Sequence, residues 1–284
     1  MSDRLRLLGR VLVRAELQVK SGLAIGGEGL AGLSVTDGAV VRDPLSGEPY
    51  VPGSSLKGKL RALIERAVGA SLAPISAAQG PGGAAQGRRV LRLHRCASEK
   101  EYREAALLTG YSGCPVCHLF GIAPEGFTGL PTRLVTRDAA LTEASRAVLL
   151  AKRTELPFTE VKTESALDRL TAAATPRWRE RVPAGAVFAA RWDLSFFELG
   201  GVDLKDERLL ALLVAGLALL EDDYLGGGGS RGYGRVAFAK LEVSLAHDGG
   251  VSPAVRELVG ALAGKSTVAE ALKAAGSPLE SPGA

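Results

Sequence analysis

The chain has 284 residues, of which 46% are hydrophobic and 23% charged, a balance typical of a globular protein long enough for a sizeable core. The sequence shows no charged N-terminal stretch followed by an apolar one, and no apolar run of about 18 residues. We therefore expect that the protein is not secreted through a signal peptide, does not span a membrane and is located in the cytoplasm. Three cysteines argue against a disulfide framework, and a net charge of +4 mildly favours a polyanionic partner.

Hydrophobic periodicity predicts three strands and two helices along the chain. Apolar and polar residues alternate over residues 10–20, 186–197 and 235–246, as in half-buried strands. Apolar residues recur at helical spacing over residues 56–68. Residues 206–222 form an apolar-rich helix that is too short to cross a bilayer. These patterns alone predict an α+β fold.

Two further stretches have distinct compositions. Residues 71–87 are low in charge and rich in Gly, Ala, Gln and Pro, which predicts a mobile loop or disordered insertion. Residues 252–274 predict one or two small helices, and the last ten residues predict disorder.

The helix at residues 56–68 begins beside a cluster of cations. Pro52 and Gly53 break the chain before it. Two serines are candidates for its N-cap: Ser54 and Ser55. Three cations follow in its first turns: Lys57, Lys59 and Arg61. Because free N–H groups at a helix N-terminus attract anions, this is a candidate phosphate seat; an ordinary surface helix is the alternative.

Three cysteines and one histidine have the spacing of a metal knuckle. The candidate ligands are His94, Cys96, Cys114 and Cys117. Thiolates and an imidazole around a C-x-x-C suit tetrahedral Zn²⁺, and a fully ligated set is structural because no position is left open for water. Three alternatives remain: His118 as the fourth ligand, free buried cysteines, and a C-x-x-C-H haem attachment. The haem attachment is typical of exported proteins, and the sequence has no export signal.

A glycine-rich run covers residues 226–235, between a helix and a strand. A P-loop or dinucleotide fingerprint needs the opposite order, so neither is predicted. Glycines such as Gly228 and Gly232 let the backbone approach phosphates, while Arg231 adds charge and Tyr233 offers a stacking face. A flexible connector is the alternative.

Ten motifs in a consistent order resemble the RAMP (repeat-associated mysterious protein) superfamily. Within it, the match is closest to the repeating backbone subunit of the type III-A (Csm-type) CRISPR interference complex. The motifs are GLAIGG (22–27), VRDP (41–44), GEPY (47–50), PGSSLKGKLRAL (52–63), CPVCHLFG (114–121), RLVTRDA (133–139), TEVKTE (159–164), DRLT (168–171), ERVPAGA (180–186) and GGGSRGYGRV (227–236).

This resemblance implies an architecture. It implies a ferredoxin-like βαββαβ (RRM-like) core with large insertions, in a single domain over residues 1–248. Residues 70–125 then hold a linker and a zinc knuckle, and residues 126–184 form a thumb or lid that wedges between bases of a guide–target duplex. Residues 249–284 form a helical and disordered tail.

The resemblance also implies roles for single residues. An aspartate just before the V-R-D-P motif is required for metal-dependent RNA cleavage in the family, and Asp37 falls at that place, flanked by Thr36 and Gly38 where the family commonly differs. Its carboxylate suits Mg²⁺ or another divalent cation, or helps to deprotonate a ribose 2′-OH. Asp43 is the alternative, although it is more readily a turn residue. The expected RNA-binding residues are Ser54, Ser55, Lys57, Lys59, Arg61, Arg137, Gly228, Arg231, Gly232 and Tyr233.

The function implied is that of a guide-RNA-binding backbone subunit that cuts guide-paired target RNA at regular intervals. Its expected partners are the guide RNA, the target RNA, copies of itself in a filament and other subunits of a type III complex. Two alternatives stand beside this hypothesis: a non-cutting scaffold subunit of a type III-D complex, and a zinc-stabilised protein–protein adaptor.

Overall fold

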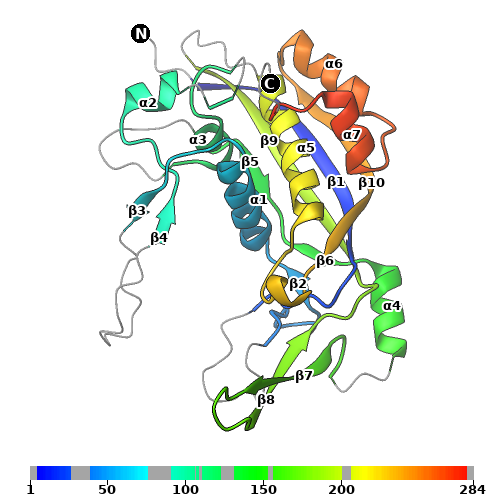
Figure 1. Cartoon of the computed structure of the whole chain (residues 1–284). Coiled ribbons are helices and arrows are strands. Elements are labelled where there is room, and N and C mark those ends of the chain that lie inside the picture. The colour runs from blue at the N-terminus through cyan, green and yellow to red at the C-terminus, as the bar shows by residue number, and fades with distance from the viewer. Residues whose placement is uncertain are drawn as a thin grey trace.

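Two long strands that pair along most of their length form the centre of the protein, which we describe from a computed structural model (Figure 1). The structure describes residues 5–26, 39–75, 91–105, 107–108, 111–122, 131–152, 156–199 and 206–279. β1 (Leu5–Val19) pairs antiparallel with β9 (Val187–Leu199) on one edge and β10 (Val236–Asp248) on the other. The sheet order is β10-β1-β9-β6-β2, and β5 also pairs with β9.

The remaining strands of this sheet are short. They are β2 (Tyr50–Val51), β5 (Leu134–Thr136) and β6 (Ala139–Leu141). Every pairing in the sheet is antiparallel. The described chain is therefore a mixed α/β protein built on a sheet.

Two helices cover one face of the sheet and make the main core (Figure 1). α1 (Gly53–Ala67) contacts α5 (Asp206–Asp222) along its length. The buried face of α1 carries Leu56, Leu60 and Ile64, all with no exposed surface. Alternate residues of β9, such as Trp192, meet them from the sheet because side chains on a strand alternate between its two faces.

The other elements extend from this core. They are β3 (Ala73–Ile75), β4 (Leu91–Leu93), α2 (Glu99–Glu104), α3 (Pro115–Phe120), α4 (Glu143–Ala151), β7 (Glu160–Leu167), β8 (Ala174–Arg181), η1 (Gly229–Arg231), α6 (Pro253–Leu262) and α7 (Val268–Ala275). β7 and β8 form a hairpin that projects at one end of the molecule (Figure 1). α6 and α7 pack against α5 and β10. Among the described residues, none of the helices combines the length and apolarity needed to cross a membrane.

The five elements predicted from periodicity are all present, with shifted ends. β1 begins at Leu5 rather than at residue 10, and the tail forms two helices as expected. The predicted serine N-cap of α1 is wrong: Pro52 occupies that position with no side-chain cap, and Asp138 Oδ1 accepts the Gly53 N–H at 2.7 Å. Of the loop expected at residues 71–87, the part up to Ile75 is described and includes β3.

Truncation of the α1 core face should be costly. Leu60→Ala should lower the free energy of unfolding by about 2 to 5 kcal/mol, because it removes buried surface and leaves a cavity between α1 and α5. Leu150→Ala is the matched control, since Leu150 in α4 is 56% exposed, and it should change stability by less than about 0.5 kcal/mol. Chemical denaturation measures both; equal losses in the two variants would contradict the packing described.

Candidate functional site

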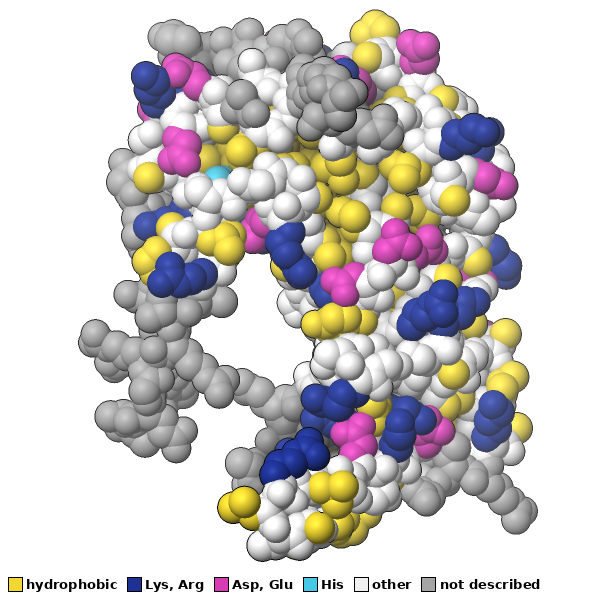
Figure 2. Space-filling model, in the orientation of Figure 1, with side chains coloured by type: hydrophobic (Ala, Val, Ile, Leu, Met, Phe, Trp, Pro, Cys, Tyr) yellow, Lys and Arg dark blue, Asp and Glu magenta, His cyan; other side chains and the backbone are white. Residues whose placement is uncertain are grey.

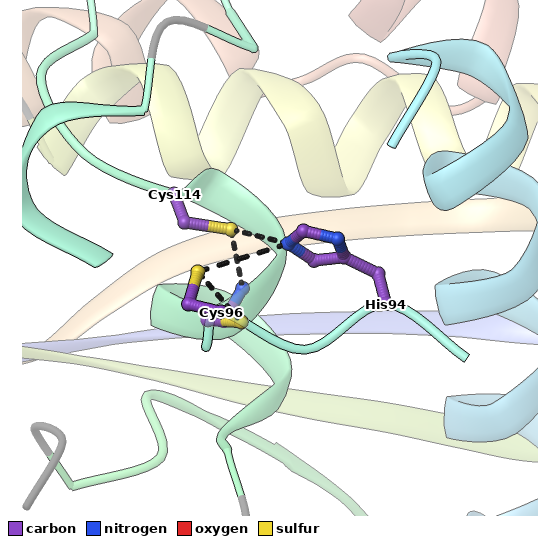
Figure 3. Close-up of side chains that lie close together, drawn as sticks. His94, Cys96 and Cys114 are labelled. Atoms are coloured by element: carbon purple, nitrogen blue, oxygen red, sulfur yellow. Dashed lines mark hydrogen bonds between the residues drawn. The ribbon is translucent and has the colours of Figure 1, made fainter. Parts of the chain in front are cut away.

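Four buried side chains from two separate segments converge on one point (Figure 3). Their ligand atoms all lie within 4.8 Å of one another, and the set is His94, Cys96, Cys114 and Cys117. His94 and Cys96 follow β4, whereas Cys114 is the N-cap of α3 and Cys117 lies in its first turn. The structure thus brings together the four ligands expected from spacing.

The spacing of these atoms fits a tetrahedral ion. Cys96 Sγ and Cys117 Sγ are 3.6 Å apart, and His94 Nε2 lies 3.1 Å from Cys114 Sγ and 3.8 Å from Cys96 Sγ. Two sulfurs on a tetrahedral Zn²⁺ are expected about 3.8 Å apart, given Zn–S bonds of about 2.3 Å. His94 Nδ1 is 2.8 Å from the carbonyl oxygen of Ser71, a contact that directs Nε2 toward the sulfurs.

The electrostatics of the cluster also favour a cation. Hydrogen bonds, first with Cys114 and then with Cys96, hold the pKa of Cys117 far below its usual range, a direction that favours the thiolate form. A buried anion needs a compensating charge. The cluster is therefore compatible with a bound metal ion such as Zn²⁺.

His118 does not belong to the cluster. Its Nδ1 lies 2.6 Å from the Tyr111 hydroxyl, and its ring packs edge-on against Tyr102 at 4.4 Å. Burial, with a contribution from Arg133, lowers the pKa of His118 to about 4, so the imidazole is neutral at pH 7. Of the two histidines considered as the fourth ligand, the structure places His94 with the cysteines, whereas His118 contacts Tyr111 and Tyr102.

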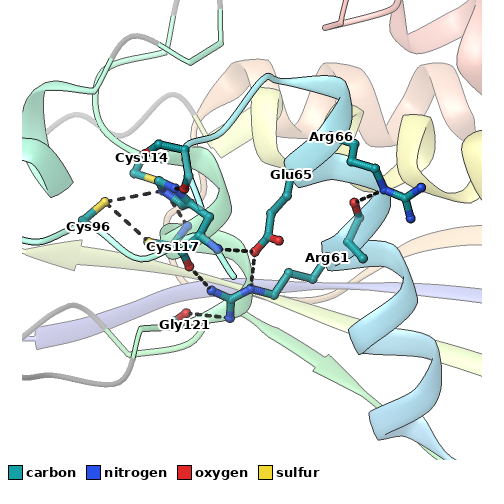
Figure 4. A network of polar contacts seen from close by, with 10 residues as sticks. Arg61, Glu65, Arg66, Cys96, Cys114, Cys117 and Gly121 are labelled. Atoms are coloured by element: carbon teal, nitrogen blue, oxygen red, sulfur yellow. Dashed lines mark hydrogen bonds and ion pairs between the residues drawn. The ribbon is translucent and has the colours of Figure 1, made fainter. Parts of the chain in front are cut away.

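An ion pair on α1 attaches the His94–cysteine cluster to the core (Figure 4). Arg61 Nε donates to Glu65 Oε1 at 2.8 Å, and the same oxygen accepts the His94 N–H at 3.2 Å. Arg61 Nη2 donates to the His94 carbonyl at 2.7 Å, and Nη1 donates to the carbonyl of Gly121. Both backbone groups of one ligand are therefore held by two residues one helical turn apart.

The two lysines of the predicted phosphate seat are also bonded within the protein. Lys57 Nζ donates to the Leu134 carbonyl at 3.0 Å, and burial lowers the pKa of Lys57. Lys59 Nζ pairs with Asp223 at 3.0 Å and lies over the ring of Tyr224 at 3.8 Å. Of the serines at this helix start, Ser54 is exposed and Ser55 is half-buried. That they bind RNA stays a prediction.

A second site forms where three segments meet, which we call the junction: residues 22–26, the base of the β7–β8 hairpin and the glycine-rich loop 226–234. Leu23 exchanges two backbone hydrogen bonds of 2.8 Å with Val182, directly after the hairpin. On the next residue, the Ala24 carbonyl accepts the Gly227 N–H at 2.8 Å. One short segment therefore joins the hairpin to the loop.

The glycine-rich loop is tightly packed rather than a simple connector. Gly226 and Gly234 both have positive φ, at 76° and 73°. A Cβ at Gly226 would lie 2.4 Å from the Ala24 carbonyl oxygen, and one at Gly234 would lie 2.0 Å from that of Leu225. Only glycine fits such backbone contacts. Gly228 and Gly232 are the left-handed residues on either side of η1, which contains Arg231.

A buried carboxylate of β8 clamps the chain at the junction. Glu180 is 4% exposed, and its Oε2 accepts the Val40 N–H at 3.0 Å. Its Oε1 accepts from Arg42 at 2.6 Å and from the Thr159 hydroxyl at 2.7 Å. Burial opposes the charge, yet the three donors together lower the pKa of Glu180 below its usual value.

Tyr233 is turned inward at the junction. Its ring is 2% exposed, its hydroxyl donates to Glu164, and Lys162 and Arg181 lie over its ring at 5.1 Å. That this ring offers a stacking face for a base stays a prediction, and in this conformation the ring is covered. Lys and Arg side chains gather at this end of the molecule (Figure 2), and Arg231 is 56% exposed and 3.9 Å from Glu164.

The expected catalytic residue, Asp37, lies outside the described residues, but both flanks of its segment are described. Gly26 and Val40 pair in a β-bridge, and the Val41 N–H donates to the Ile25 carbonyl at 3.1 Å. In the sequence, Asp37 comes three residues before Val40, which the Glu180 clamp holds. The alternative, Asp43, is a turn residue: its Oδ1 accepts the N–H groups of Leu45 and Ser46.

Sequence reasoning missed the hairpin, the Glu180 clamp and the Arg61–Glu65 pair. The strands of the hairpin are exposed on both faces over most of their length, so they lack the apolar alternation that signals a strand. Residues 156–181 therefore read as irregular. The helical spacing of Arg61 and Glu65, four positions apart, was the one signal for an ion pair there.

Fold and site together define a mixed α/β protein with a Cys₃His cluster that fits a metal ion and a basic, glycine-rich junction. The RAMP superfamily matches residues 16–237, and the chain belongs to it. It is 36% identical over 247 residues to the CRISPR system Cms endoribonuclease Csm3 of Mycobacterium tuberculosis, covering 84% of this chain and 89% of the relative. It is 32% identical over 236 residues to the protein of that name from Streptococcus thermophilus, covering 83% and 90%.

A solved structure is similar as well. The crystal structure of Methanopyrus kandleri Csm3 superposes with a TM-score of 0.50 at 25% identity, covering 84% of this chain and 78% of that chain. The type III-B Cmr-beta complex bound to cognate target RNA contains a chain with a TM-score of 0.51 at 17% identity, which speaks to the fold alone.

Release of the Arg61 contacts should loosen the metal cluster. Arg61→Ala removes the donors to the His94 and Gly121 carbonyls, so we expect a chelator to extract bound Zn²⁺ about tenfold faster, as measured with a colorimetric zinc indicator. Arg66→Ala is the control on the same helix. Among the described residues Arg66 bonds the Ala62 carbonyl of its own helix, so this variant should leave the rate unchanged. Identical rates in both variants would rule out this attachment.

Loss of the Glu180 charge should destabilise the junction in a pH-dependent way. Glu180→Gln should cost about 2 to 4 kcal/mol of unfolding free energy at pH 7, because Arg42 loses its buried partner. The lowered pKa makes this contribution complete above pH 4.5 and lost as the pH falls further, so the two unfolding curves should converge in acid.

A matched change on the neighbouring strand serves as the control. Glu160 pairs with Arg181 at 2.7 Å but is more exposed, so Glu160→Gln should cost less than about 1 kcal/mol. A gap between Glu180→Gln and wild type that persists unchanged at low pH would show that the charge is not responsible.

Proposed function

We propose that this chain is a guide-RNA-binding backbone subunit of a type III CRISPR ribonucleoprotein that cuts guide-paired target RNA. Its relatives over most of the chain are named as Csm3 endoribonucleases. The observation that carries the proposal is the junction, where the flanks of the Asp37 segment, a basic hairpin and a glycine-rich loop meet. Cleavage needs the RNA backbone, the base-wedging element and the catalytic carboxylate to be close together. The described flanks of the Asp37 segment, the hairpin and the glycine-rich loop meet at the junction, which supports this proposal.

The strand order supports a ferredoxin-like core. Taking β1, α1, β5 with β6, β9, α5 and β10 in sequence gives a βαββαβ series. In space β10, the fourth strand of the series, lies beside β1, the first. β9, the third strand, lies between β1 and the second strand, which is made of β5 and β6. The second strand is divided into two three-residue pieces, which explains why periodicity does not reveal it.

We assign Zn²⁺ to the four-ligand cluster, where it would act structurally. With three sulfurs and one nitrogen supplied by the chain, no coordination position is left for water or substrate. Residues 91–122 have few elements of their own, so a metal would stabilise this insertion while Arg61 and Glu65 connect it to α1.

In the proposed reaction, the protein binds and orients RNA, and Asp37 provides the catalytic carboxylate. A divalent cation held there would polarise the scissile phosphate. The Glu180 clamp then acts as a positioning device: it fixes Val40 and Arg42, close in sequence to Asp37, against the base of the hairpin. The hairpin, with Leu170 97% exposed at its tip, is the element that would contact the duplex.

Removal of the Asp37 carboxylate should abolish cutting without loss of RNA. In the assembled complex, Asp37→Ala should lower the rate of cleavage of a guide-complementary RNA at least about 100-fold, because one catalytic group is removed, while guide RNA still copurifies with it. Denaturing gel electrophoresis of labelled target RNA measures the rate.

Asp43→Asn is the comparison for this experiment, because Asp43 is an acid of the same segment that serves as a turn residue. It should retain cleavage within about a factor of three. Unchanged cutting by Asp37→Ala would remove the nuclease assignment. A complex that holds guide RNA yet never cuts, even as wild type, would instead identify a scaffold subunit.

A further inference from the structure

Arg42 joins three separate segments of the chain through one guanidinium group. Its Nη1 donates to the Gly47 carbonyl at 2.8 Å and to the Pro157 carbonyl at 2.9 Å. Its Nη2 donates to the Thr159 hydroxyl oxygen and to Glu180 Oε1, both at 2.6 Å. These acceptors lie in the turn that follows Arg42, directly before β7, and in β8. We call Arg42 and its four acceptors the Arg42 network.

The network holds both strands of the β7–β8 hairpin at their base. Pro157 and Thr159 lead into β7, and Glu180 is the second-last residue of β8. Above the base, the two strands pair with each other in a sheet of their own, which projects from the molecule (Figure 1). One further contact joins Glu164 of β7 to the Tyr233 hydroxyl. The direction in which the hairpin points therefore depends on a small set of contacts near its base.

The same network reaches the stretch of chain that follows Asp37. The second carboxylate oxygen of Glu180 accepts the Val40 N–H at 3.0 Å, and in the sequence Val40 lies between Asp37 and Arg42. The two charged side chains are largely withdrawn from water, at 26% exposed for Arg42 and 5% for Glu180. Charge-assisted hydrogen bonds are short and strong, so they hold this stretch in a set position relative to the hairpin.

The backbone inside the network is strained. Phe158, between two of the acceptors, has a φ of 64° and is only 6% exposed. Bulky residues rarely adopt this left-handed conformation, and such strain persists only where the surrounding structure holds the backbone. Arg42 bonds the residues on both sides of Phe158, so it fixes one particular path of the chain into the hairpin.

The hairpin is a lever that magnifies small changes at its base. Each of its strands has 8 residues, which span about 26 Å at about 3.3 Å per residue. A tilt of about 8° at the base would move the tip by about 3.6 Å, close to the ~3.4 Å between successive nucleotides along a duplex strand. A small tilt is thus enough to shift a contact at the tip by one nucleotide.

We propose that Arg42 is a positioning residue that sets which phosphodiester of the target RNA is cut, because it fixes the hairpin relative to the chain that follows Asp37. Loosening the network then changes the position of the cut and not only its rate. This inference rests on the proposed function, since it takes as given that the hairpin contacts the duplex and that the complex cuts RNA.

The test maps cuts in the assembled complex at single-nucleotide resolution, with an end-labelled, guide-complementary RNA on a denaturing gel. Arg42→Lys keeps the positive charge beside Glu180, but one ammonium group cannot replace a planar guanidinium that bonds four acceptors. The share of product cut at a neighbouring phosphodiester should rise at least about tenfold over wild type, because the hairpin base is no longer held in one position.

Arg146→Gln is the matched control. Arg146 also pairs with a residue of the turn after Arg42, Glu48, but it belongs to α4 and not to the hairpin base. It should leave the cut positions unchanged. Thr159→Val is a second test variant of nearly the same size, which removes the hydroxyl that joins Arg42 to Glu180. It should spread the cuts in the same way, and it keeps the test informative if Arg42→Lys does not fold.

Thermal unfolding and copurified guide RNA show which variants are folded and assembled. Wild-type cut positions in both Arg42→Lys and Thr159→Val, even at a reduced rate, would overturn the inference and leave Arg42 a structural role. Equal spreading of the cuts in Arg146→Gln would overturn it as well, because loosening of the turn would then be the cause. A wild-type complex that holds guide RNA and cuts nothing would instead refute the nuclease part of the proposed function, which is a separate outcome.

Discussion

The organisation of the junction depends on one five-residue segment that is hydrogen-bonded along both of its edges. Leu23 pairs with the chain that leaves the hairpin, and Ala24 pairs with the glycine-rich loop. Backbone hydrogen bonds are directional and short, so they fix two otherwise separate elements to within a fraction of an ångström of one another. The hairpin buries too little apolar surface to hold that position alone, because its strands are mostly exposed.

α1 has a similar role at the other end of the core. Its apolar face packs on α5, and its cations reach three other parts of the fold: the Leu134 carbonyl in β5, Asp223 after α5 and the metal insertion. Cations in the first turns of a helix are usually solvated. Here each of the three cations donates to a group inside the protein, so the positive charge near the helix start is held in place rather than carried on flexible side chains.

Sequence alone predicts the parts of this protein whose physics is local. Periodicity identifies α1, β1, β9 and β10, because one face of each is buried, and a run of apolar residues identifies α5, which is buried almost all round. The cysteine spacing indicates the knuckle ligands. It does not distinguish His94 from His118 as the fourth ligand, because that depends on the contact between the His94 imidazole and the Ser71 carbonyl. Partners distant in sequence stay hidden: Glu180 and Val40 are 140 residues apart, and nothing near either residue indicates the other.

The two-stranded ladder of β3 and β4 has a consequence for how this chain tolerates change. Ile75 and Leu91 pair at the end of the ladder, so the two described residues that flank positions 76–90 lie side by side. The entropy of closing a loop rises slowly with its length, by about 0.6 kcal/mol for each doubling. This is therefore a place where related chains can gain or lose residues, and where a peptide tag can be inserted, without displacing the metal ligands that follow.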